Sequence, residues 1–171
     1  MAYRAKTARK KTARQTLNSA MAQTDFERTV KISAPLALVW SVMVEVESWQ
    51  EWTPSVSRVV RLSSGPLRVG SRVRIHQPKL PPAVWCVIEI ISNSSFTWIS
   101  LAPGVRVTAR HAVEEIVNGV CVTLSIRYDG LLGSLLARYV GDLNQHYLAL
   151  EANGLKARCV ALAEKEPAQN L

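Results

Sequence analysis

His111 is the side chain best suited to move a proton or to orient a polar ligand. It alternates with small apolar residues along the segment 105–117, so we expect its ring to be buried. The charge of an imidazole changes near neutral pH, which suits general acid–base chemistry. A core histidine with a hydrogen-bond partner explains the same pattern, and both interpretations stay open. Tyr139 is the second candidate for proton transfer if the protein is an enzyme.

Aromatic and apolar residues form a second group of candidates for contact with a ligand. Trp52 and Trp98 are two of five tryptophans, and their faces suit flat or apolar ligands. Tyr139, Leu143 and His146 recur at helical spacing, so they share one face of a predicted helix. The predicted ligand-binding residues are Trp52, Trp98, His111, Tyr128, Leu136, Tyr139, Leu143 and His146.

Several kinds of catalytic site have no counterpart in the sequence. There is no GxSxG turn, no glycine-rich phosphate loop and no HExxH motif, and the three histidines lack the spacing of a metal site. We therefore predict no metal and no cofactor. Cys86, Cys121 and Cys159 are far apart in the chain, which favours buried, reduced thiols in a cytoplasmic protein.

The net charge of +8 is concentrated at the N-terminus. Residues 1–22 contain six basic residues and no acidic one, whereas the rest of the chain has 15 basic and 13 acidic residues. We predict a basic disordered tail over 1–22, with no apolar segment behind it that would make a secretory signal. The tail is interpreted as a solvated extension, as a weak contact for nucleic acid or anionic membrane, or as an upstream addition to a start at Met21.

The elements that must position these residues follow a simple order. Alternating apolar residues predict a strand over 26–32, two short helices follow at 36–43 and 45–52, and six more strands run from 55 to 128. Asn118-Gly119 is the strongest hairpin signal between them. A long helix is predicted over 131–159, with Gly130 and Gly133 loosening its start, and a frayed tail over 163–171. The fold class is α+β, with a curved, seven-stranded antiparallel sheet wrapped around the C-terminal helix.

A family resemblance rests on motifs at the joints between these elements. The motifs are Ile32-Ser33-Ala34-Pro35 with Val39-Trp40; Val46 to Trp52 with Pro54; Val69-Gly70-Ser71; Trp85-Cys86-Val87 with Glu89; Phe96-Thr97-Trp98; Pro103-Gly104; His111; Asn118-Gly119; and Leu155-Lys156. In this order the chain resembles the START/Bet v1-like (SRPBCC) superfamily, which has the helix-grip fold, and in particular its bacterial polyketide cyclase/dehydrase and lipid-transport branch. The resemblance covers roughly residues 24–160, within a predicted domain over 23–162.

The resemblance implies a deep cavity between the sheet and the long helix, and assigns Trp49 to the docking of the short helices. Three hypotheses about function remain open. The protein binds a small hydrophobic molecule such as a lipid, a polyketide or an aromatic metabolite; or it is a cyclase/dehydrase-like enzyme using the same cavity; or it acts through its basic tail. Neither the residues nor the resemblance decides whether turnover occurs, which ligand binds or how many subunits assemble.

Overall fold

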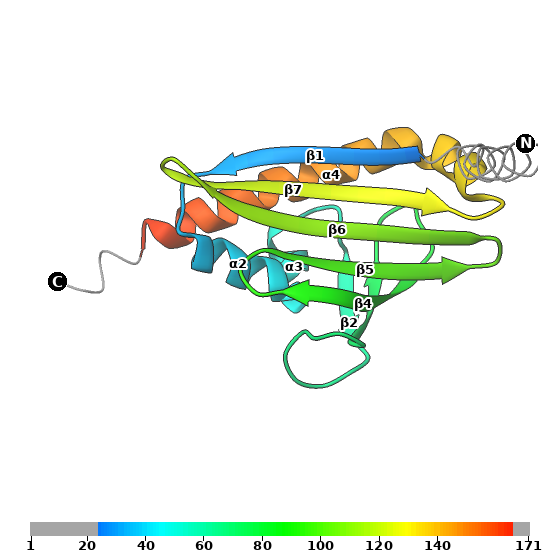
Figure 1. Ribbon diagram of the computed structural model, residues 1–171, viewed down its shortest axis with the longest axis horizontal. Coiled ribbons are helices and arrows are strands. Elements are labelled where there is room, and N and C mark those ends of the chain that lie inside the picture. The colour runs from blue at the N-terminus through cyan, green and yellow to red at the C-terminus, as the bar shows by residue number, and fades with distance from the viewer. Residues whose placement is uncertain (1–23, 166–171) are drawn as a thin grey trace, which may run out of the picture.

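The computed structural model describes residues 24–165 and places seven strands in one antiparallel sheet, in the order β1-β7-β6-β5-β4-β3-β2 (Figure 1). The predicted tail over 1–22 lies outside the described residues, as does most of the predicted tail over 163–171. The strands are β1 (Thr24–Ile32), β2 (Arg58–Arg61), β3 (Arg72–His76), β4 (Ala83–Ile91), β5 (Ser95–Ala102), β6 (Val105–Ile116) and β7 (Gly119–Asp129).

The helices lie on one side of this sheet. The long helix α4 (Gly133–Ala163) runs along β1 and β7, and the short helices α2 (Leu36–Val44), η1 (Val46–Ser48) and α3 (Trp49–Trp52) follow β1 (Figure 1). Of these, α2 and α3 pack against α4. The predicted fold class is confirmed, because a sheet of sequential hairpins has one face covered by the terminal helix. Among residues 24–165, no helix is long and apolar enough to cross a bilayer.

Local interactions explain where the observed elements depart from the predicted ones. The second strand begins at Arg58 and not at residue 55, because the preceding hydroxyls bond to each other: Thr53 Oγ1 lies 2.8 Å from Ser55 Oγ, and both residues are buried. Such local side-chain bonds compete with strand pairing. At the other end of the chain, α4 continues to Ala163, four residues beyond the predicted end.

Two glycines shape the turns at opposite ends of the sheet. Asn118 and Gly119 have φ of 65° and 142°, so the predicted hairpin turn is confirmed. Gly130 has φ of 100°, and a Cβ there would overlap the carbonyl oxygen of Gly104. Leu132 N donates to that same oxygen at 3.0 Å. Gly130 therefore allows two turns to be joined closely, and the predicted loosening of the helix start stays a prediction.

Cys159 lies in the core at the C-terminal end of α4, whereas Cys86 and Cys121 are only half-buried, contrary to the prediction of three buried thiols. Burial raises the pKa of the Cys159 thiol from 9.0 to about 11, and the charge of Arg158 offsets part of this rise. The raised pKa means that the folded state holds the proton more tightly than the unfolded state does. The stability that the buried, protonated Cys159 thiol gives to the folded state is complete below pH 9 and is lost as the pH rises through 11.

We therefore expect the free energy of unfolding to fall between pH 9 and 11, with Cys159 contributing on the order of 2 kcal/mol. Urea unfolding at stepped pH, compared between the wild type and Cys159→Ala, measures this contribution. The variant should show a shallower fall over that range. Parallel curves for the two proteins would contradict the assignment.

Candidate functional site

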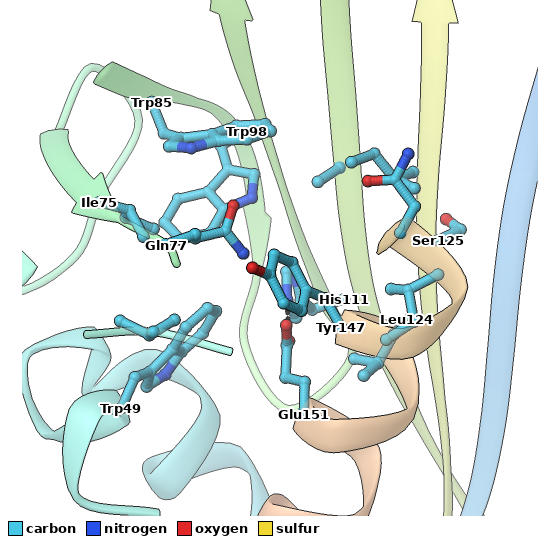
Figure 2. Close-up of a pocket in the computed structure, with 15 residues that line it drawn as sticks. Trp49, Ile75, Gln77, Trp85, Trp98, His111, Leu124, Ser125, Tyr147 and Glu151 are labelled. Carbon is cyan, nitrogen blue, oxygen red and sulfur yellow. Dashed lines mark hydrogen bonds and ion pairs between the residues drawn. The ribbon is translucent and has the colours of Figure 1, made fainter. Parts of the chain in front are cut away.

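A cavity lies between the inner face of the sheet and the helices α3 and α4 (Figure 2). Alternation along the strands positions its wall, because every second side chain points inward. On β6, Ala109, His111 and Val113 are buried, and on β5 the buried Phe96 and Trp98 take the corresponding positions. The predicted inward phase of His111 is thus confirmed, and so is that of Trp98.

Three tryptophans and His111 form an aromatic wall on one side of the cavity. The ring of Trp98 lies 5.5 Å from that of Trp85 and 5.4 Å from that of Trp49, measured between centroids. His111 stacks on Phe96 with centroids 4.5 Å apart and lies 5.2 Å from Trp49. These separations are typical of favourable aromatic pairs, so the wall is a packed unit. Figure 2 shows Trp85, Trp98 and Trp49 around the space that His111 also borders.

His111 is paired with Glu151 of α4 across the cavity. The distance between His111 Nε2 and Glu151 Oε1 is 2.7 Å, and the side chains are 7% and 12% exposed. An ionised carboxylate only accepts hydrogen bonds, so this contact places the proton on Nε2. His111 Nδ1 is buried and has no hydrogen-bond partner among residues 24–165, and neither has Trp98 Nε1. The contact with Glu151 therefore occupies His111 Nε2 and leaves Nδ1 able to form a hydrogen bond with another molecule.

Tyr147 links α4 to the loop between β3 and β4. Its hydroxyl donates to the carbonyl oxygen of Pro78, and its ring borders the cavity beside Gln77 (Figure 2). Burial raises the pKa of the Tyr147 hydroxyl, so it remains a donor at neutral pH. This contact holds the helix and the loop together over one side of the site.

The enclosed space is small. The cavity measures about 60 Å³, whereas pockets for drug-sized ligands measure about 300–1,000 Å³. The deep cavity that the resemblance implies is therefore largely filled by side chains in this conformation. A ligand larger than a few atoms must displace some of the lining residues.

The predicted site residues fall into separate places. Trp98 and His111 line the cavity. Trp52 does not, although its ring lies 5.7 Å from that of the lining residue Trp49. Trp49 also docks the short helices as predicted, because its Nε1 donates to the carbonyl oxygen of Met43 at 3.1 Å.

Tyr128 and Leu136 belong to a second apolar cluster between β7 and the first turns of α4. The predicted inward phase of Tyr128 is confirmed by its burial. Its hydroxyl and the side-chain amide of Asn144 bond to each other, with the hydroxyl oxygen 3.1 Å from Oδ1 and 2.9 Å from Nδ2. Asn144 also lines the cavity, so this bond supports one side of the site from behind.

The prediction that Tyr139, Leu143 and His146 form the inner face of α4 is wrong. Tyr139 is 87% exposed and His146 is exposed, while Leu143 is half-buried and does not line the cavity. The face toward the sheet carries apolar, small and polar residues, among them Ala137, Asn144, Tyr147, Leu148, Glu151 and Ala152. The small residues let the helix approach the sheet closely, whereas the larger Tyr139 is left in solvent.

Glu151, Tyr147, Asn144 and Trp85 are the site residues that the sequence analysis missed. Glu151 gave a usable signal, since Tyr147 and Glu151 are four residues apart and share a helix face with Leu148. An acid on a face that also carries apolar residues is unusual in an ordinary packed helix. Its partner, however, lies 40 residues away in the chain, and no spacing connects the two.

Within the described part of the chain, no three histidine, cysteine, aspartate or glutamate residues gather as they would around a metal ion. The cavity instead joins an aromatic wall to one histidine–carboxylate pair. Its chemistry is suited to holding an apolar molecule by its surface and one polar group by hydrogen bonds.

Three solved structures share this fold at low sequence identity. A ginseng major latex-like protein from Panax ginseng has a TM-score of 0.66 at 15% identity, over 80% of this chain and 97% of its own. The Zhui aromatase/cyclase from Streptomyces sp. R1128 has a TM-score of 0.63 at 17% identity, over 80% and 93%. A START superfamily protein from Mycobacterium smegmatis has a TM-score of 0.63 at 14% identity, over 81% and 98%. At these identities the likeness concerns the fold alone.

No curated protein sequence matches the chain. The sequence profile of the family described as "Polyketide cyclase / dehydrase and lipid transport" matches residues 23–159, which is most of the chain and includes all seven strands and nearly all of α4. The helix-grip architecture and this match agree, and the chain belongs to the polyketide cyclase/dehydrase and lipid transport family of the START/Bet v1-like superfamily.

Proposed function

We propose that the protein binds a small hydrophobic molecule, such as a lipid, a polyketide or an aromatic metabolite, between the sheet and α4. The ligand would rest on Trp98, Trp85 and Trp49, with binding driven by the removal of apolar surface from water. Its polar group would meet the His111–Glu151 pair. We place this activity in the cytoplasm, which the unpaired cysteines support.

The observation that carries the proposal is a pair of buried nitrogens in the cavity wall. Trp98 is 2% exposed and His111 is 5% exposed, yet Trp98 Nε1 and His111 Nδ1 have no hydrogen-bond partner in the described part of the chain. Leaving such a group unbonded costs about 1–3 kcal/mol, so buried polar groups nearly always have partners. A ligand with an oxygen or nitrogen atom beside an apolar body would supply them.

The small cavity determines how such a ligand must enter. Tyr147 closes one side of the site through a single hydroxyl contact with Pro78, and a rotation of its side chain would widen the space between α4 and the β3–β4 loop. Breaking one such hydrogen bond costs roughly 1 kcal/mol. We propose that binding and this opening occur together.

Substitution of Trp98 by leucine is expected to weaken ligand affinity about tenfold, since part of the buried aromatic contact is lost. The full chain is titrated with a fatty acid, a naphthol and a linear 1,3-diketone, and binding is followed by tryptophan fluorescence and native mass spectrometry. His146→Ala is the matched control, because His146 is an exposed aromatic residue of α4 outside the cavity.

The control should bind as the wild type does. If His146→Ala weakens binding more than Trp98→Leu does, the site lies on the outer face of α4 and the proposal is wrong. If the wild type retains none of the three probes at millimolar concentration, the binding function is rejected.

A cyclase/dehydrase-like enzyme is the second candidate, and the His111–Glu151 pair favours it. A carboxylate that fixes the proton on Nε2 leaves Nδ1 of a neutral imidazole free to accept a proton from a carbon next to a carbonyl group. In this hypothesis Tyr139 has no part, because it is exposed to solvent. A β-hydroxy ketone added as a further probe separates the two functions: a carrier returns it unchanged, whereas a dehydrase removes its α hydrogen and its β-hydroxyl group and returns the enone, lighter by one molecule of water.

A further inference from the structure

Exposed apolar side chains gather at one end of the molecule, where β7 leads into α4. Leu131 and Tyr139 are each 87% exposed, Leu135 is 67% exposed and Leu132 is 51% exposed. Leu101, at the end of β5, is 70% exposed. We call these five residues the leucine patch. Soluble proteins tolerate single exposed leucines, but an adjacent set usually marks a contact surface.

Backbone contacts bring the parts of the patch together. Leu132 N donates to the oxygen of Gly104, in the turn that follows Leu101, and the Leu132 side chain packs over Gly104. Leu131 precedes α4, and Leu135 and Tyr139 lie four residues apart on α4, which places these two on one side of the helix. The β5–β6 turn and the start of α4 lie at the same end of the sheet in Figure 1.

The N-terminal segment joins the fold at this same end. Thr24, the first residue of β1, pairs with Tyr128 of β7, and Leu131 follows Tyr128 by three residues. The 22 residues at the start of the sequence contain six basic side chains and no acidic one. Near the patch in sequence, the exposed Arg106 and Arg138 outnumber the exposed Asp142 by one charge. Most of the excess positive charge of the chain therefore belongs to the sequence that precedes β1.

We propose that the leucine patch docks on an anionic lipid bilayer, with the basic residues of 1–22 attracted to its headgroups. Leucine and tyrosine side chains suit the boundary between acyl chains and headgroups, and basic residues add attraction to anionic lipids. A nucleic acid would match the charge but not the apolar surface. A second copy of the chain would match the apolar surface but would bring two basic segments together, which repel each other.

Co-sedimentation with vesicles tests the docking surface. The full chain is mixed with vesicles of phosphatidylcholine alone or with phosphatidylserine added. We expect binding to the anionic vesicles to be at least tenfold stronger, and to weaken as salt rises. The variant Leu131→Ser/Leu135→Ser/Tyr139→Ser should bind at least tenfold more weakly, since each leucine leaving water contributes roughly a tenfold gain.

Two further full-length variants complete the test. Replacing the six basic residues of 1–22 by glutamine should weaken binding at least tenfold and remove the salt dependence. Val117→Ser is the control, because Val117 is 89% exposed in the β6–β7 turn at the opposite end of the sheet, and it should bind as the wild type does.

Three results would overturn the proposal. The wild type could fail to bind anionic vesicles, or the triple serine variant could bind as the wild type does. Alternatively, the wild type could be a dimer that the serine substitutions convert to a monomer, with vesicle binding unchanged. That last result would assign the patch to a second copy of the chain.

Discussion

Replacing His111 by phenylalanine is expected to lower the free energy of unfolding by about 3 kcal/mol, because it leaves a buried carboxylate without its partner. The Glu151 side chain is 12% exposed, and among residues 24–165 its hydrogen-bond partner is His111 Nε2, at 2.7 Å. A phenylalanine fills the space beside Phe96, so the loss measures the orphaned acid and not a void. Chemical denaturation of the purified variant gives the value.

The double variant His111→Phe/Glu151→Leu should recover most of this stability. Apolar residues of similar volume often replace a buried pair of polar or charged groups at little or no cost, since the desolvation penalties of both partners disappear together. The difference between the double variant and the sum of the single variants gives the coupling energy of the pair. Additive effects would mean that the two side chains do not interact.

The surface pair Arg158–Glu51 is the matched control for this cycle. Its side chains are 40% and 57% exposed, at a distance of 3.4 Å. Solvent screens such pairs, so Glu51→Gln should change the free energy of unfolding by less than about 1 kcal/mol.

The stable double variant His111→Phe/Glu151→Leu also tests whether the pair orients the ligand. If it binds the ligand probes as the wild type does, the pair has no part in orienting the ligand.

Gly154→Ala is expected to destabilise the protein by about 1–3 kcal/mol, because there is no room for a methyl group between α4 and α3. A Cβ on Gly154 would overlap the carbonyl oxygen of Trp52, and would lie 3.1 Å from its carbonyl carbon. These are backbone atoms, so the clash can be relieved only by moving one helix away from the other. Because Trp49 begins α3 and Glu151 lies on α4, that movement also widens the cavity.

Gly141→Ala, on the same helix, should have the opposite effect. A Cβ there would meet the Phe26 ring at 3.5 Å, which is an ordinary contact. Alanine favours the helix over glycine by about 1 kcal/mol, so this variant should be as stable as the wild type or more so. Thermal unfolding of the two variants separates the steric effect from helix propensity. If both glycine variants are stabilised, α3 and α4 are not in close contact at Gly154.

The strands and their inward phases were predictable because each depends on a local rule. A strand alternates with a period of two, so the burial of His111, Trp98 and Tyr128 follows from their neighbours. The turn at Asn118-Gly119 follows from residues that tolerate positive φ. Sequential hairpins give the order of β2 to β7, whereas the pairing of β1 with β7 is seen only in the structure.

The inner face of α4 could not be predicted in the same way. Apolar residues occur on more than one side of this helix, so a period of 3.6 gives their spacing but not which side is buried. The sheet selects the side with Ala137 and Ala152, because small residues permit close contact, and Tyr139 is left in solvent. The exposure of Leu135 and Tyr139, the two residues of the leucine patch that lie on α4, follows from that selection.

The sequence by itself determined the fold class, the order of the elements and the inward direction of His111. Only the tertiary structure decided that Glu151 is its partner and that the cavity between them is small. The reason is physical. Strand phase and turn geometry are set by neighbouring residues. The His111–Glu151 pair joins residues 40 apart in the chain, so it depends on how closely the helix meets the sheet. The volume left between the packed side chains depends on the same contact.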